Sequence, residues 1–152
     1  MLDCETTGIE PYYALSTVKH FADGGQVRIS SRAMLDGLAS LGHSDSTIQT
    51  LSEYALDHGQ LVDAPDLMSD ERLVFQTATG PNRLSPMAQL QMVAAVQPFV
   101  SGGVSKTVLL PPDTGVQEIE DTLIAAWRLG LKAIALYREG SKLAQPLTAD
   151  EE

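Results

Sequence analysis

Two stretches combine residue types that could do chemistry, MLDCETTGIEP (1–11) and SGGVSKT (101–107). The first holds the only thiol of the chain, Cys4, beside carboxylates and threonine hydroxyls. A reactive cysteine needs a cation or a helix N-terminus nearby to stabilise its thiolate. The neighbours of Cys4 are Asp3 and Glu5, whose negative charges disfavour a thiolate. The local sequence therefore favours a structural role for Cys4.

The second stretch resembles a phosphate-binding loop, but it departs from the required pattern G-x-x-x-x-G-K-[ST]. Ser105 stands where a glycine should precede Lys106, and Val100 occupies the first glycine position. Lys106 and Thr107 also fall inside an apolar run that predicts a strand, whereas the motif needs them at the start of a helix. We therefore expect no Walker loop, and we expect Gly102 and Gly103 to relieve crowding where the strand begins.

The remaining polar candidates have simpler interpretations. DGGQ (23–26) is typical of a hairpin turn, Glu10 precedes a proline in a predicted turn, and Lys142 is expected in solvent. One cysteine cannot form an internal disulfide, and no pair of histidines has metal-ligand spacing, so we expect no metal site. The histidines are expected at the surface or at helix ends: His20, His43 and His58.

The composition is that of a globular protein, with 43% hydrophobic and 20% charged residues among 152. The formal net charge of −10 disfavours binding to a nucleic-acid polymer, because phosphate backbones repel an acidic surface. No apolar run approaches the roughly 20 residues that span a bilayer. The first residues lack the basic segment of a signal peptide. We therefore expect a cytoplasmic chain without a membrane segment.

The first half of the sequence predicts a β-hairpin followed by a helical hairpin at about 31–59. A strand within 12–22, a turn at 23–25 and a strand at 26–30 precede a helix at about 32–41 that Ser31 caps. Its apolar face carries Met34, Leu35, Leu38 and Leu41. A second helix begins at Ser44 or Ser46, where Ser46 and Gln49 fit a capping box, and ends at Gly59.

The second half predicts a βαβ unit at about 104–138, after a helix from Ser85-Pro86 to about Val96. Apolar strands at 104–110 and 132–138 flank a helix that begins at the capping sequence Thr114-x-x-Gln117. The apolar positions of this helix are Val116, Ile119, Leu123, Ile124 and Trp127. A strand–helix–strand unit at this spacing gives parallel strands with a right-handed crossover, which places the chain in the α/β class.

Four stretches together resemble the adenosylcobalamin-dependent, class II ribonucleotide reductases. They are MLDCETTGIEP (1–11), DGGQVRI (23–29), QPFVSGGVSKTV (97–108) and AWRLGLKAIALYREGSKLAQPL (126–147). Their order matches along nearly the whole chain. One departure is Leu109, which stands where the family has an asparagine.

The resemblance implies that residues 1–147 are the C-terminal part of a ten-stranded α/β barrel domain, with the helical hairpin as an insertion and 148–152 as a disordered acidic tail. The parent enzyme reduces ribonucleotides to deoxyribonucleotides for DNA synthesis, using adenosylcobalamin to generate a thiyl radical on a finger-loop cysteine. A pair of further cysteines supplies the reducing electrons. The family's phosphate-binding loop ends just before the residues matching Met1, so Thr6, Thr7 and Gly8 are expected near the substrate phosphate.

The cysteine count then suggests a fragment. The reaction uses three thiols and the chain has one, which matches a family cysteine outside the radical and redox set. We therefore expect no catalytic residue in this chain, no cobalamin binding by the chain alone, and association with the N-terminal remainder of the reductase or self-association. The alternative hypothesis is a non-catalytic binding or assembly module that keeps the reductase fold.

Overall fold

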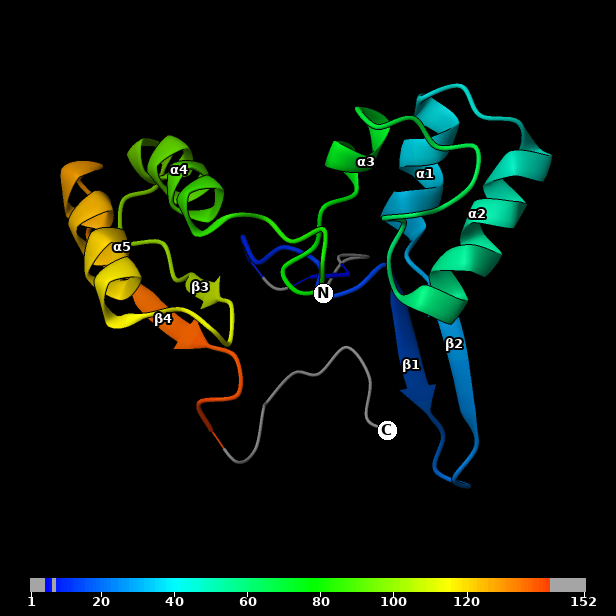
Figure 1. The fold of residues 1–152 in the computed structure, drawn as a ribbon, viewed down its shortest axis with the longest axis horizontal. Helices are drawn as coiled ribbons and strands as arrows, with labels where there is room; N and C mark the ends of the chain where they lie inside the picture. Colours follow the sequence, from blue (N-terminus) through cyan, green and yellow to red (C-terminus); the bar gives the residue numbers. More distant parts are fainter. Residues whose placement is uncertain (1–4, 7, 143–152) are drawn as a thin grey trace. The chain divides into compact units, whose positions relative to one another are not determined.

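The computed structural model describes residues 5, 6 and 8–142, whose elements are labelled in Figure 1. In chain order they are β1 (Ser16–His20), β2 (Gln26–Ser30), α1 (Arg32–Ser40), α2 (Asp45–His58), α3 (Glu71–Val74), α4 (Pro86–Val96), the 3-10 helix η1 (Gln97–Phe99), β3 (Thr107–Leu110), α5 (Val116–Arg128) and β4 (Ala135–Arg138).

The described residues divide into two compact units. Residues 12–83 form the first unit, and the described part of 1–11 joins residues 84–142 in the second. The sequence prediction treated 1–147 as one domain, whereas the structure groups the N-terminal loop with the C-terminal βαβ region.

The β-hairpin of the unit 12–83 has the predicted turn. Strands β1 and β2 pair antiparallel with Ser16 opposite Ser30. In the turn, the Phe21 amide donates to the Gly25 carbonyl at 2.7 Å, and Gly24 adopts a φ of +85°. Glycine occupies this left-handed region without the steric cost that a Cβ would impose.

Both helices of the predicted helical hairpin begin at serine caps. Ser31 Oγ accepts a hydrogen bond from the Met34 amide at 3.2 Å, and Ser44 Oγ accepts one from the Thr47 amide at 3.3 Å. The predicted capping box at Ser46 is therefore wrong, because Ser46 lies inside α2 and Gln49 donates to Glu53 instead. Gly59, with a φ of +69°, ends α2 as predicted.

The core of the unit 12–83 forms where α1 and α2 pack against the loop that follows them. Leu41, predicted on the apolar face of α1, is 41% exposed because it lies at the C-cap. The buried residues of this core are Leu15, Met34, Leu38, Leu51, Ala55, Leu61, Ala64, Leu67 and Phe75.

The second unit contains the predicted βαβ arrangement. Strands β3 and β4 are parallel, with Thr107 paired to Ala135, and both begin three residues later than predicted. Helices α4 and α5 lie side by side in Figure 1, and their inner faces meet Val108 and Leu110 of β3 in a small core. The α/β class is confirmed.

The predicted cap of α5 was wrong. Its N-cap is Gly115, whose amide donates to the Glu118 carboxylate at 2.8 Å, so Thr114 is not the cap. Among the predicted apolar residues, Ile119 packs against the core, whereas Val116 and Trp127 are 84% and 78% exposed. The apolar pattern therefore covers two faces of the helix, and only one contacts the rest of the unit.

The described residues form two separate two-stranded sheets and do not close into a barrel. Ten strands therefore stay an expectation for the parent enzyme. Across the described part of the chain, no helix is both long enough and apolar enough to cross a bilayer.

Candidate functional site

Glu10 links the N-terminal loop to the start of β3. Its carboxylate contacts β3 through both oxygens. Oε1 accepts a hydrogen bond from the Thr107 amide at 2.9 Å, and Oε2 lies 2.7 Å from Lys106 Nζ. The loop that contains Thr6 and Gly8 is thereby anchored by a residue 96 positions away in the sequence.

Lys106 is the centre of this polar cluster. Its side chain is only 4% exposed, so its ammonium group needs protein partners in place of water. An ammonium group has three N–H donors. Those of Lys106 meet Glu10 Oε2, Gln89 Oε1 at 3.1 Å and the Thr107 carbonyl. The donor capacity of Lys106 is filled.

Gln89 on α4 completes the cluster from the other side, and it is 2% exposed. Its Oε1 accepts from Lys106 Nζ and from the Leu109 amide at 3.2 Å. Its Nε2 donates to the carbonyls of Leu109 and Leu84, both at 3.3 Å. Gln89 therefore pairs with Leu109 through both an amide and a carbonyl, as a neighbouring strand would.

This cluster is suited to holding backbone in place. A buried polar network with complete hydrogen bonds makes the surrounding core rigid, and the hydrogen bonds of Lys106 are complete. The rejection of a phosphate loop agrees with this geometry, since the Lys106 ammonium is committed to protein oxygens. The expected role of Gly102 and Gly103 was wrong, because a Cβ at either position would meet no atom of the described residues within 4 Å.

Sequence reasoning missed Glu10 by assigning it to a turn. Glu10 and Lys106 are far apart in the sequence, and neither flanking segment shows a pattern that predicts the pairing. The usable signal was a lysine placed just before a buried strand, because a buried ammonium requires a carboxylate partner.

The residues expected near the substrate phosphate belong to this anchored loop. Thr6 is half-buried, and Gly8 is exposed with a φ of +58°. Among the described residues, a Cβ at Gly8 would meet nothing within 4 Å, so the backbone conformation is what favours glycine at this position. Thr7 and Cys4 lie outside the described residues.

Leu109 occupies the position where the resembled family has asparagine, and its side chain is buried at 2% exposure. Its backbone N–H and C=O are both bound by Gln89. The substitution therefore leaves the backbone polar groups of this residue satisfied.

In the unit 12–83, His43 differs from its expected surface position. Its side chain is 14% exposed, and its Nε2 lies 3.3 Å from Glu71 Oε1 without hydrogen-bond geometry. The second carboxylate oxygen of Glu71 accepts from the Met68 amide at 2.9 Å. His58 is at a helix end as predicted, where its ring stacks on Tyr54. His43 contacts Glu71 of α3, whereas His58 stacks on a residue of its own helix, so the two histidines do not form a catalytic pair.

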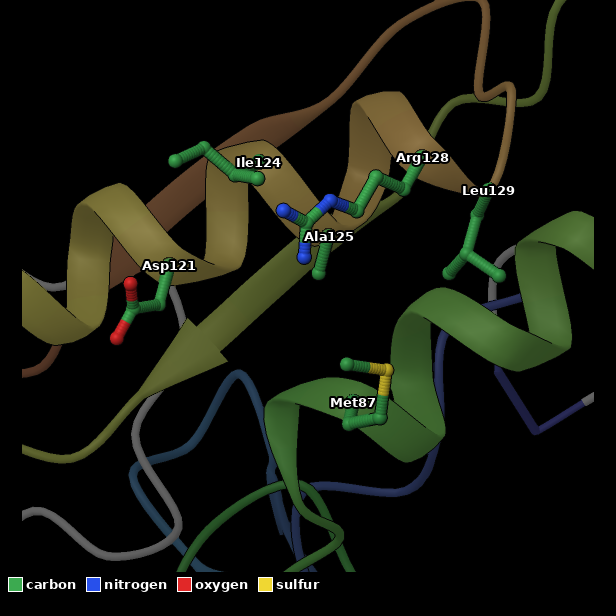
Figure 2. Close-up of a pocket in the computed structure, with 6 residues that line it drawn as sticks. All are labelled: Met87, Asp121, Ile124, Ala125, Arg128 and Leu129. Atoms are coloured by element: carbon green, nitrogen blue, oxygen red, sulfur yellow. The ribbon is translucent and has the colours of Figure 1, made fainter.

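A groove in the second unit lies between α4 and α5. Its volume is about 430 Å³, and its residues are drawn in Figure 2. Met87 projects from α4, and Ala125 faces it from α5. The full lining is Met87, Asp121, Ile124, Ala125, Arg128 and Leu129. This groove is mainly apolar and suits a side chain or a packed segment.

Comparison with known proteins decides the family. The family model described as "Ribonucleotide reductase, barrel domain" matches residues 1–137. The chain belongs to this family. This chain is 41% identical over 149 residues to a protein of Streptantibioticus cattleyicolor named vitamin B12-dependent ribonucleotide reductase. The match covers 98% of this chain and 25% of that protein. A protein of Rhodopirellula baltica with the same name is 42% identical over 151 residues, which cover 97% of this chain and 14% of that protein.

A solved structure supports the fold of this chain. The Actinobacillus ureae class Id ribonucleotide reductase alpha subunit aligns with a TM-score of 0.60 at 20% identity, covering 86% of this chain and 22% of that subunit. This chain therefore spans about a quarter or less of the length of these relatives.

The groove between α4 and α5 does not fit cobalamin. Cobalamin is larger than the drug-sized ligands that occupy pockets of roughly 300–1,000 Å³, and the groove of about 430 Å³ presents no histidine to a metal. Over residues 5, 6 and 8–142, no three His, Cys, Asp or Glu side chains are grouped closely enough to hold an ion.

Proposed function

We propose that this chain is the C-terminal barrel segment of an adenosylcobalamin-dependent ribonucleotide reductase and that it acts in the reduction of ribonucleotides to deoxyribonucleotides. The observation that carries the proposal is the similarity over 97–98% of the chain to proteins named vitamin B12-dependent ribonucleotide reductases. In this proposal the cofactor, when bound, supplies the radical chemistry, and this segment supplies part of the wall that surrounds the substrate.

The segment is proposed to be inactive alone. Reducing the ribose 2′ carbon with loss of water requires two electrons, which a dithiol supplies as it becomes a disulfide, and a third thiol carries the radical. The chain contains one cysteine, and Glu10 and Lys106 are occupied with each other. The missing thiols must therefore come from the remainder of the reductase.

Thr6, Thr7 and Gly8 are proposed to lie next to the substrate phosphate. The anchoring of their loop through Glu10 supports this role, because only Ile9 separates Glu10 from Gly8, and this short connection restricts where the loop can move. Their proposed contribution is to shape the phosphate-binding region, while the gripping amides belong to the preceding segment.

The test is reconstitution. The Rhodopirellula baltica reductase, with the region matched by this chain removed, is mixed with this chain, adenosylcobalamin, a ribonucleotide and a dithiol. We expect deoxynucleotide to form only when both polypeptides are present. Product from this chain alone would contradict the cysteine argument. A chain that binds the remainder tightly without restoring turnover would favour the alternative, a non-catalytic assembly module with the reductase fold.

A further inference from the structure

Helix α5 carries an exposed apolar stripe next to its buried face. Ile119 and Ala126 pack into the core of the second unit. Three apolar residues lie on one side of this buried face and are exposed. Their exposed fractions are 84% for Val116, 44% for Leu123 and 78% for Trp127. These three positions are spaced by seven and four residues, which places them on one line along the helix.

The stripe continues into the groove between α4 and α5. Ile124, 37% exposed, lies beside Leu123 and lines the groove with Met87 and Leu129, which are 44% and 38% exposed. Figure 2 shows the side chains of α5 and α4 that line this groove. Exposed apolar side chains that form a continuous stripe mark an interaction site, whereas scattered ones do not.

The small sheet beneath α5 indicates that the unit is completed by more protein. Strands β3 and β4 form a two-stranded parallel sheet. Parallel sheets occur almost only with both faces covered, and two strands alone are marginally stable. Relatives carry this segment within chains of which it makes up 14–25%, so most of each relative's chain lies outside the segment and is available to cover such surfaces.

Charges beside the stripe disfavour a second copy of this chain as the occupant. Glu120 and Asp121 are acidic residues of α5, Arg128 is its single basic residue, and the whole chain has a formal net charge of −10. Two such faces would bring like charges together, which costs free energy at an interface. A partner face with an apolar centre and flanking lysine or arginine residues would complement α5.

We propose that the stripe formed by Val116, Leu123, Ile124 and Trp127 is the docking surface for the remainder of the reductase, through an apolar segment flanked by basic residues. This inference rests on the proposed function, because it names where the required remainder binds. Trp127 is its central anchor, since large aromatic side chains contribute most to the affinity of such contacts.

The experiment uses Trp127 as a specific probe, because it is the only tryptophan in the chain. The chain is labelled with 5-fluorotryptophan and titrated with the unlabelled Rhodopirellula baltica remainder, while ¹⁹F NMR follows the single resonance. We expect the resonance to shift at saturation and to lose its sensitivity to solvent deuteration. An unchanged resonance on a demonstrably bound chain would overturn the docking surface and leave the proposed function standing.

Paired variants then measure the affinity by calorimetry. Trp127→Glu and Leu123→Glu are expected to weaken binding about tenfold or more, while the matched controls Trp127→Phe and Leu123→Met stay within about threefold. Circular dichroism verifies that each variant is folded. Equal affinity for the glutamate variants and their controls would refute the proposal.

Two further outcomes are decisive. The fluorine resonance could shift with the concentration of this chain alone, while sedimentation shows a dimer. This result would mean that a second copy occupies the stripe, and it would overturn the proposal. Docking at Trp127 without turnover in the reconstitution assay would instead contradict the proposed function, while the proposed docking surface would still stand.

Discussion

Gln89 offers the sharpest test of the polar cluster. We consider Gln89→Met, which keeps an unbranched side chain of similar length but removes both the amide donor and the carbonyl acceptor. The matched control is Gln91→Met, because Gln91 lies two residues further along α4 and is exposed. The two variants share their helix and their chemistry and differ in burial.

The expected magnitude follows from the groups that Gln89 serves. Without it, the Leu109 amide loses its acceptor, the carbonyls of Leu109 and Leu84 lose a donor, and Lys106 Nζ loses one of three partners. Each buried polar group left unsatisfied costs about 1–3 kcal/mol. Partial rearrangement reduces the sum, so we expect a loss of about 2–4 kcal/mol, against less than about 0.5 kcal/mol for Gln91→Met.

Amide hydrogen exchange measured by NMR at Leu109 reports this loss directly. Exchange through local opening scales with the opening equilibrium, and each 1.36 kcal/mol changes that equilibrium tenfold. We expect exchange at Leu109 to become roughly 30-fold to 900-fold faster in Gln89→Met and to stay within about threefold in the control. Equal protection in the two variants would show that Gln89 does not hold the edge of β3.

Three further predictions concern caps, core and thiol. Ser44→Ala is expected to destabilise the chain by about 1 kcal/mol and Ser46→Ala by less than about 0.5 kcal/mol in urea unfolding, since only Ser44 caps α2; similar losses would restore the capping box at Ser46. Leu38→Ala, at a fully buried position, should cost about 2–5 kcal/mol, whereas Leu73→Ala, 63% exposed, should cost little in the same measurement; comparable costs would contradict the assigned core. Cys4→Ser should leave turnover of the reconstituted reductase within about twofold to threefold, and a loss of about 100-fold would place this thiol among the reacting groups.

Local patterns in the sequence predicted much of the fold correctly. Ser31 caps α1, Gly59 ends α2, and the two apolar strands around α5 are parallel. Each of these features depends on contacts between residues close in the chain or on a connection too long for a hairpin, so composition and spacing were sufficient. The family assignment also came from sequence, because long shared strings are far more specific than a short motif.

Longer-range contacts were not predictable in the same way. The open space around Gly102 and Gly103 depends on which segments pack nearby. In α5, the sequence shows five apolar positions but does not indicate that two faces are involved, of which one stays exposed.

The sequence by itself determined the family, the α/β class and a thiol count too low for the proposed radical chemistry. Only the tertiary structure decided that Glu10 and Gln89 share the ammonium of Lys106 and that Trp127 faces outward. The physical reason is distance along the chain. A cap or a turn is specified by neighbours, whereas the partner of a buried charge and the exposure of a helix face are set by segments that meet only after folding.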